Sequence, residues 1–254
     1  MIADKLPASH GAELLAGMMD RYAKLRGRLA ASWDAQRVWE RHVSKSVHVP
    51  LDVKVCDAMV TLCLLWRWPV TAFLLRASFL GYLRPGEAAA LRRHEVLLPS
   101  DGTCSLVDSV VIVISSPKTR FRAARIQSVH VADALLATLG LRCVGRLPPT
   151  TRLCPGGYNS FSKKFQALLS AVGLCASPYT PASLRGGGAV ADLLRGCSLT
   201  FIMFHGRWAA VKTTTHYLQS GLAAHVAATL PTPARLLVKT FAAALPELLD
   251  AYRH

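Results

Sequence analysis

The sequence predicts a mainly helical protein with one small antiparallel β-hairpin inserted near its middle. Segments with a helical character occupy most of residues 11–96 and most of the chain after residue 132. Residues 105–115, by contrast, are rich in Val and Ile and bounded by Ser, which is typical of a strand. Apolar residues make up 52% of the 254 residues, enough for a sizeable core without disulfides or metal.

Before the hairpin, the chain is expected to form a series of helices. Residues 11–43 contain helical segments, and residues 44–50 form a linker that ends at a proline. Residues 52–80 are expected to form one or two helices with an interruption at an internal proline. In residues 81–96, "GYLRPGEAAALRRHEV", a turn leads into a helix that starts after Pro85, a favoured residue of the first helical turn.

The hairpin itself is expected to have a cationic tip. Residues 116–123 form a basic loop between the strand at 105–115 and a second, alternating strand at 125–131. Further helices are expected over residues 132–140, 160–173, 182–195, 198–204, 210–219, 221–229 and 233–251.

The charge of the chain indicates a polyanionic partner. Thirty Lys and Arg residues stand against fifteen Asp and Glu residues, a net charge of +15. Nucleic acid is the first candidate and an anionic membrane surface the second. The longest apolar runs, 58–66 and 68–75, fall far short of the roughly 20 residues that span a bilayer, and the N-terminus does not resemble a signal peptide. No membrane association is therefore expected.

The cysteines indicate neither a disulfide framework nor a metal site. There are seven, an odd number, and no pair has the C-x-x-C spacing of zinc ligands. We expect reduced, mostly buried thiols in an intracellular protein without metal or cofactor. If the polyanionic partner is DNA, we expect the protein in the nucleus of a eukaryotic cell, or otherwise in the cytoplasm or nucleoid.

Four short stretches bring together residues suited to phosphate chemistry. Arg84 stands in "GYLRPGEAAAL", Lys118 in the hairpin loop, and Arg185 in "SLRGGGAVADLL". Trp208 follows Arg185 by twenty-three residues and Tyr217 follows Trp208 by nine, in "GRWAAVKTTTHY". Each stretch alone is a weak signal, but their order along the chain is specific.

In this order the stretches resemble the catalytic domain of tyrosine recombinases, the phage-integrase type of site-specific recombinase. The "RGGGA" variant is closest in style to eukaryotic Crypton-like mobile-element recombinases, and Trp stands in the His position of the third box, as in some members of the family. The resemblance implies a catalytic domain of the DNA breaking-rejoining fold over residues 48–230. Residues 1–47 would be the helical remnant of a core-binding domain, and residues 231–254 a C-terminal helix that exchanges between protomers or packs on its own domain.

The resemblance also implies a role for each residue in DNA cleavage and rejoining through a 3′-phosphotyrosine, as in integration. Arg84 and Arg185 would clamp the non-bridging phosphate oxygens. Lys118 would protonate the 5′-oxygen leaving group, and Trp208 would donate its indole N–H to the phosphate. Tyr217 would be the covalent nucleophile. We expect Arg84, Arg185 and Trp208 to face one basic concave surface within reach of Lys118.

Several assignments have alternatives. Arg120, Arg122 and Arg125 compete with Lys118 for the role of general acid, and Trp208 is alternatively a core residue. The glycines after Arg185 indicate a close backbone approach, to a neighbouring helix or to DNA. Glu87 is expected to support the fold or to orient an arginine. The residues expected to contact the DNA backbone are Arg120, Arg122, Arg125, Lys163, Lys164 and Arg207; a solvated helix face is the alternative for the two lysines.

Two departures from the family pattern bear on activity. The family's second box usually has His or Lys three residues before the arginine, where this chain has Ala182. The segment before the catalytic boxes is also short for a complete DNA clamp. The leading hypothesis is a recombinase that binds double-stranded DNA and assembles as a synaptic dimer or tetramer. A catalytically degenerate DNA-binding remnant and a type IB topoisomerase-like nicking-closing enzyme are the alternatives.

Overall fold

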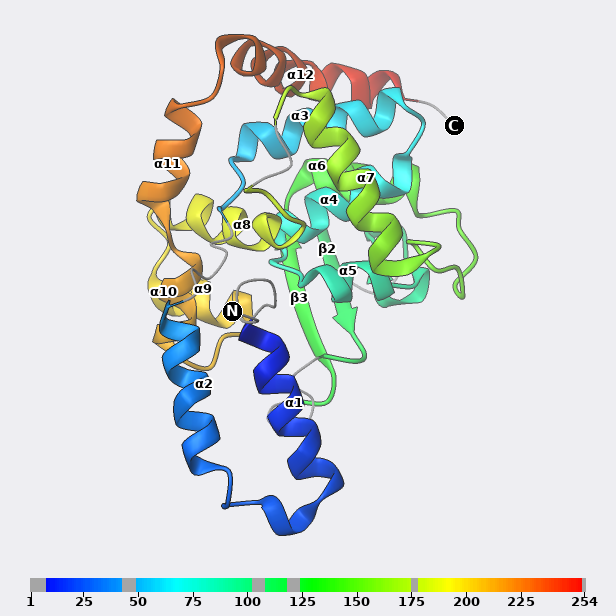
Figure 1. Cartoon of the computed structure of the whole chain (residues 1–254). Helices are drawn as coiled ribbons and strands as arrows, with labels where there is room; N and C mark the ends of the chain where they lie inside the picture. The colour runs from blue at the N-terminus through cyan, green and yellow to red at the C-terminus, as the bar shows by residue number, and fades with distance from the viewer. Residues whose placement is uncertain (1–7, 43–48, 102–107, 118–123, 175–177, 253–254) are drawn as a thin grey trace. The chain divides into compact units, whose positions relative to one another are not determined.

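The computed structural model describes residues 8–42, 49–101, 108–117, 124–174 and 178–252. The chain divides into two compact units, Met1–Val47 and His48–His254. In the first unit, α1 (Ala8–Arg21) and α2 (Ala30–His42) pack against each other as a helical hairpin joined through a 3-10 turn, η2 (Ala23–Leu25) (Figure 1). Gln36 donates a 2.6 Å hydrogen bond to the Ala8 carbonyl across this pair.

The second unit is a helical domain with one small sheet (Figure 1). Its helices before the sheet are α3 (Val53–Leu65), α4 (Pro69–Leu80) and α5 (Pro85–Ala90). Those after it are α6 (Ala134–Cys143), α7 (Gly157–Ala171), α8 (Ala182–Leu194), α9 (Leu199–Gly206), α10 (Val211–Tyr217), α11 (Ser220–Ala228) and α12 (Thr232–Ala251). The expected mainly helical architecture is thus confirmed.

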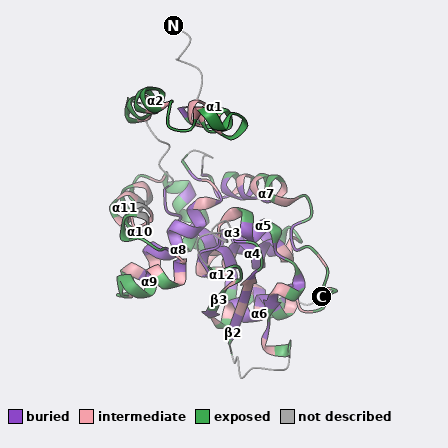
Figure 2. Cartoon of the chain, turned by 90° about the horizontal axis from the view of Figure 1, so that it is seen from below, coloured by how far each residue is buried: buried purple, intermediate pink, exposed green. Residues whose placement is uncertain are grey.

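Helices α3, α4 and α8 form the centre of this unit. They are apolar on almost every side, as helices enclosed by others must be, and they carry much of the buried surface in Figure 2. The expected interruption between the first two falls at Arg67–Trp68, and Pro69 takes the first position of α4. Helix α12 packs on α3 within the same chain, where Thr61 Oγ1 donates a 2.8 Å hydrogen bond to the Phe241 carbonyl.

The sheet has three antiparallel strands in the order β1-β2-β3. The expected hairpin is β2 (Ser109–Ile114) with β3 (Gln127–Ala132), paired so that Val111 faces His130. The additional strand, β1 (Val96–Leu97), pairs with the other side of β2.

Strand β1 corrects the expectation of a helix through residue 96, because α5 ends at Ala90. The backbone then turns outward to a neighbouring segment: Leu153 N donates to the Leu91 carbonyl and Arg93 N to the Thr151 carbonyl, both at 2.9 Å. The Arg93 guanidinium forms an ion pair with the Asp101 carboxylate, with 2.7 Å between Nη2 and Oδ1. These contacts are tertiary, so the local sequence "ALRRHEV" does not reveal them.

The described cysteines, Cys56, Cys63, Cys143, Cys154 and Cys197, are free. Burial raises the pKa of the Cys143 thiol to about 12, so this thiol stays protonated at neutral pH. Within the described residues, no group of three His, Cys, Asp or Glu side chains is placed to hold a metal ion, and no helix has the length and apolar character to cross a membrane.

The glycines of α8 explain how closely this helix approaches its neighbours. A Cβ added to Gly187 would lie 2.2 Å from the Leu51 carbonyl oxygen, and one added to Gly188 would lie 1.9 Å from the Phe79 carbonyl oxygen. The same atom on Gly186 would find nothing closer than 3.7 Å. Of the two alternatives for this glycine run, the backbone approach to neighbouring protein segments is therefore the one observed.

This difference predicts unequal effects for Gly→Ala substitutions at Gly188 and at Gly186. Gly188→Ala is expected to lower the free energy of unfolding by about 3 kcal/mol, because the backbone of α4 must move aside. Gly186→Ala is expected to change it by less than about 1 kcal/mol, since Ala is the better helix former and has room here. Urea unfolding of the two variants provides the measurement. Equal destabilisation would contradict the close packing of α8 on α4.

Candidate functional site

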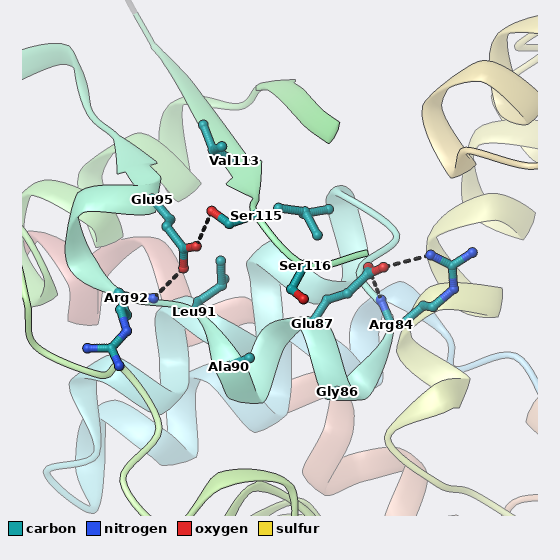
Figure 3. A pocket seen from close by; sticks show the side chains of 11 residues that line it. Arg84, Gly86, Glu87, Ala90, Leu91, Arg92, Glu95, Val113, Ser115 and Ser116 are labelled. Atoms are coloured by element: carbon teal, nitrogen blue, oxygen red, sulfur yellow. Dashed lines mark hydrogen bonds and ion pairs between the residues drawn. The ribbon is translucent and has the colours of Figure 1, made fainter. Parts of the chain in front are cut away.

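A single buried carboxylate, that of Glu87, holds two arginines at the start of α5. Its oxygens accept hydrogen bonds from Arg84 Nη1 at 2.6 Å and from Arg207 Nη2 at 2.9 Å (Figure 3 shows the first). Glu87 also accepts from the Arg84 backbone N–H at 2.8 Å, which fixes the start of the helix. The expectation that Glu87 orients an arginine is therefore confirmed.

Arg185 lies in the first turn of α8 and is buried, with 1% of its surface exposed. Its guanidinium donates to the Tyr82 carbonyl and, at 2.5 Å, to the Gly206 carbonyl. Burial, with the positive charges of Arg207 and Arg84, lowers the pKa of Arg185 to about 9. The group remains mostly protonated at neutral pH, and its charge is close to those of the other two arginines.

The aromatic residues of the third box cover Arg185. Its guanidinium carbon lies 4.7 Å from the ring centroid of Trp208 and 5.6 Å from that of Tyr217. These two rings are stacked on each other at 5.0 Å with 23° between their planes. The structure thus brings together Arg185, Trp208 and Tyr217. The expectation that Arg84, Arg185 and Trp208 face one basic concave surface is wrong for Arg185, which is buried beneath the two rings.

Tyr82 extends this aromatic stack, and sequence reasoning missed it. Its ring lies 5.9 Å from that of Trp208, and its hydroxyl donates a hydrogen bond to the Asp192 carboxylate. The backbone of Tyr82 has φ of +44°, a left-handed conformation that is rare for a bulky residue. Arg207 has φ of +56° and donates to the same Tyr82 carbonyl that Arg185 uses. Nothing in the sequence marks Tyr82 or Asp192, since their roles depend on tertiary contacts.

A cavity of about 590 Å³ opens beside Arg84, whose side chain is 24% exposed (Figure 3). Its wall runs from α5 through Arg92 and Glu95 to Ser115 and Ser116, at the end of β2. Glu95 accepts a 2.5 Å hydrogen bond from Ser115 Oγ, which ties the segment after α5 to that strand end. The cavity therefore lies where the hairpin loop leaves the sheet.

The remaining expected site residues fall into three groups. Lys118, Arg120 and Arg122 lie outside the described residues. Arg125 is exposed before β3, and Lys163 is exposed on α7.

Lys164 and Arg207, by contrast, are held by protein groups. Lys164 Nζ donates to Thr71 Oγ1 at 3.2 Å and lies 5.3 Å from the Trp68 ring centroid. Arg207, for which the sequence predicts a DNA contact, has a side chain that is only 8% exposed and is bound to Glu87.

Comparison with known proteins finds matches among solved structures only. No protein-family model and no curated protein matches the sequence. XerA recombinase superposes with a TM-score of 0.50 at 17% identity, covering 90% of this chain and 85% of that one. XerH site-specific recombinase, bound to its difH substrate in a pre-cleavage complex, gives 0.52 at 12% identity, with 90% and 72% covered. The chain thus has the tyrosine-recombinase fold expected from its sequence; the Crypton-like subtype stays a prediction.

Proposed function

We propose that this protein binds double-stranded DNA and performs site-specific recombination by cleaving and rejoining strands through a 3′-phosphotyrosine at Tyr217. The observation that carries the proposal is the convergence of Arg185, Trp208 and Tyr217, three residues from two separate sequence boxes, on the fold that XerA and XerH recombinases share. Arg84 belongs to the same site, because its positive charge helps to lower the pKa of Arg185 and its side chain lines the neighbouring cavity.

In the proposed reaction, Tyr217 Oη attacks the phosphorus of a phosphodiester and gives up its proton to water. The bond from phosphorus to the 5′-oxygen breaks, and Lys118 supplies the proton that the leaving oxygen takes up. Arg84 and Arg185 offset the charge that grows on the non-bridging oxygens. Attack by a 5′-hydroxyl on the phosphotyrosine reverses these steps and releases the tyrosine, so the strand is rejoined without an added energy source.

The closed packing of Arg185 requires a conformational step before this chemistry. Its terminal nitrogens are bound to two backbone carbonyls, and Trp208 and Tyr217 cover its guanidinium. A DNA phosphate reaches Arg185 only after those rings move. Catalytic contacts commonly tighten only when substrate is bound, so this arrangement is compatible with a resting enzyme.

The same closed packing favours a second candidate, a DNA-binding protein that no longer cleaves. Ala182 at the usual His or Lys position supports this candidate too, because the loss of one acid–base group commonly costs on the order of 10²–10⁴ in rate.

Under either candidate the protein acts where DNA is, in a nucleus or a nucleoid. We further propose that the active form is a synaptic dimer or tetramer from a mobile element, with α1 and α2 contributing to the DNA clamp.

A nicked suicide substrate tests the function directly. The nick lets the short strand beyond the cleavage site diffuse away, so a 3′-phosphotyrosyl adduct accumulates and is seen as a shifted band on a denaturing gel. An adduct supports strand transfer, and recombined or Holliday-junction products would separate a recombinase from a topoisomerase-like enzyme. DNA binding without any adduct on a cognate nicked substrate favours the degenerate candidate.

The salt dependence of duplex binding is the first quantitative prediction. With a net charge of +15, affinity is expected to fall steeply as salt rises, with log K decreasing by about 0.9 per neutralised phosphate for each unit of log[salt]. Fluorescence anisotropy of a labelled duplex across a salt series measures this slope. A flat response would argue against nucleic acid as the partner.

A further inference from the structure

A second pocket, of about 270 Å³, lies at the start of α4 and is lined by three cationic residues, Arg67, Arg152 and Lys164. The other described lining residues are apolar, aromatic or hydroxyl-bearing, so no carboxylate among them balances this charge. Trp68 forms one wall. Three like charges around one small cavity repel one another, and an anion in the cavity would relieve that repulsion.

The cations come from three separate parts of the chain, and two of them, Arg67 and Arg152, are exposed. Lys164 projects from α7, where Thr71 Oγ1 accepts from its ammonium at 3.2 Å and the Trp68 ring lies 5.3 Å away. Arg67 takes a left-handed backbone conformation, φ of +57°, two residues before α4. A lysine that merely covers an aromatic ring would account for Lys164 but not for the two arginines.

A backbone bridge joins this pocket to the cavity beside Arg84. Arg92, which lines that cavity, forms an isolated antiparallel bridge with Arg152, which lines this pocket. The guanidinium of Arg92 also donates to the Thr150 carbonyl at 3.0 Å. Arg92 and Arg152 are both exposed neighbours, so they extend the positive charge of this pocket toward the other cavity, where Glu87 and Glu95 accompany Arg84 and Arg92.

We propose that the pocket of Arg67, Arg152 and Lys164 binds a backbone phosphate of the DNA duplex, away from the bond that Tyr217 cleaves. The inference rests on the DNA-binding part of the proposed function and adds to it a defined phosphate subsite. A phosphodiester fits the observed chemistry, because it carries a single negative charge and several acceptor oxygens for the arginine and lysine donors. Such a contact fixes the register of the duplex and carries no base specificity.

The test measures duplex binding by fluorescence anisotropy over a salt series, with Tyr217→Phe protein so that strand cleavage does not contribute. Arg152→Gln and Lys164→Gln are each expected to weaken binding several-fold and to reduce the slope of log K against log[salt] by about 1. Arg146→Gln is the matched control, because Arg146 is exposed near the same segment but does not line the pocket. It is expected to leave the slope unchanged. Circular dichroism checks that each variant is folded.

Three outcomes would overturn the inference. The first is unchanged binding by both pocket variants, and the second is an equal loss in Arg146→Gln, which would reveal a general charge effect. The third is calorimetric binding of pyrophosphate that depends on Arg152 while duplex binding does not, which would make the occupant a small anion. The proposed function fails separately: wild-type protein that binds no duplex at any salt concentration refutes both proposals, whereas a missing adduct alone refutes cleavage and leaves the subsite test intact.

Discussion

Tyr217→Phe is expected to bind duplex DNA with wild-type affinity and to form no covalent adduct on a nicked substrate. The substitution keeps the ring, which stacks on Trp208 at 5.0 Å and lies over the Arg185 guanidinium, and removes only the oxygen. Because the packing of α10 is retained, the change separates chemistry from fold. Loss of a nucleophile typically lowers turnover by on the order of 10⁴-fold or more, so the adduct should fall below detection.

Tyr179→Phe provides the matched control for this experiment. Tyr179 is also largely buried, but it packs in the main core and not in the aromatic cluster around Trp208. The control should form the adduct at the wild-type rate. An adduct that persists in Tyr217→Phe would show that another residue is the nucleophile, and the assignment of Tyr217 would be abandoned.

The sequence predicts the parts of this site that short motifs encode. The order of the short motifs along the chain predicts Arg84, Arg185, Trp208 and Tyr217 as catalytic residues. The structure brings the last three into contact. The Val-rich segment predicted the hairpin because strand propensity and alternation are local signals.

The features that sequence reasoning missed arise from contacts between distant segments. Burial of Arg185 depends on carbonyls supplied by Tyr82 and Gly206, which stand 103 and 21 residues away along the chain. Tyr82 reaches Asp192 across 110 residues. Strand β1 exists because residues near 91 bond to residues near 152 instead of continuing α5. No local pattern encodes pairings of this kind, which only the assembled core determines.

Arg185→Lys is expected to reduce adduct formation by about 10²–10³-fold, the usual cost of removing one preorganised donor to a developing oxyanion. Lysine keeps the charge but has a single ammonium in place of the planar fork that reaches both the Tyr82 and the Gly206 carbonyls. The Tyr82 carbonyl keeps its hydrogen bond from Arg207, but one charge-assisted hydrogen bond of Arg185 is lost, so the free energy of unfolding should also fall, by about 1–3 kcal/mol. Single-turnover cleavage and urea unfolding measure the two effects separately.

Arg76→Lys separates the catalytic part of that loss from the structural part. Arg76 is likewise largely buried, and it bridges Asp57 at 2.6 Å and Asp133 at 3.0 Å outside the aromatic cluster. The same chemical change there should destabilise the protein to a similar degree, because it breaks a partly buried ion-pair network, yet leave cleavage per folded molecule unchanged. If both variants lose cleavage in proportion to their stability, Arg185 only supports the fold. A selective loss in Arg185→Lys would place this arginine at the phosphate, after Trp208 and Tyr217 have moved off its guanidinium.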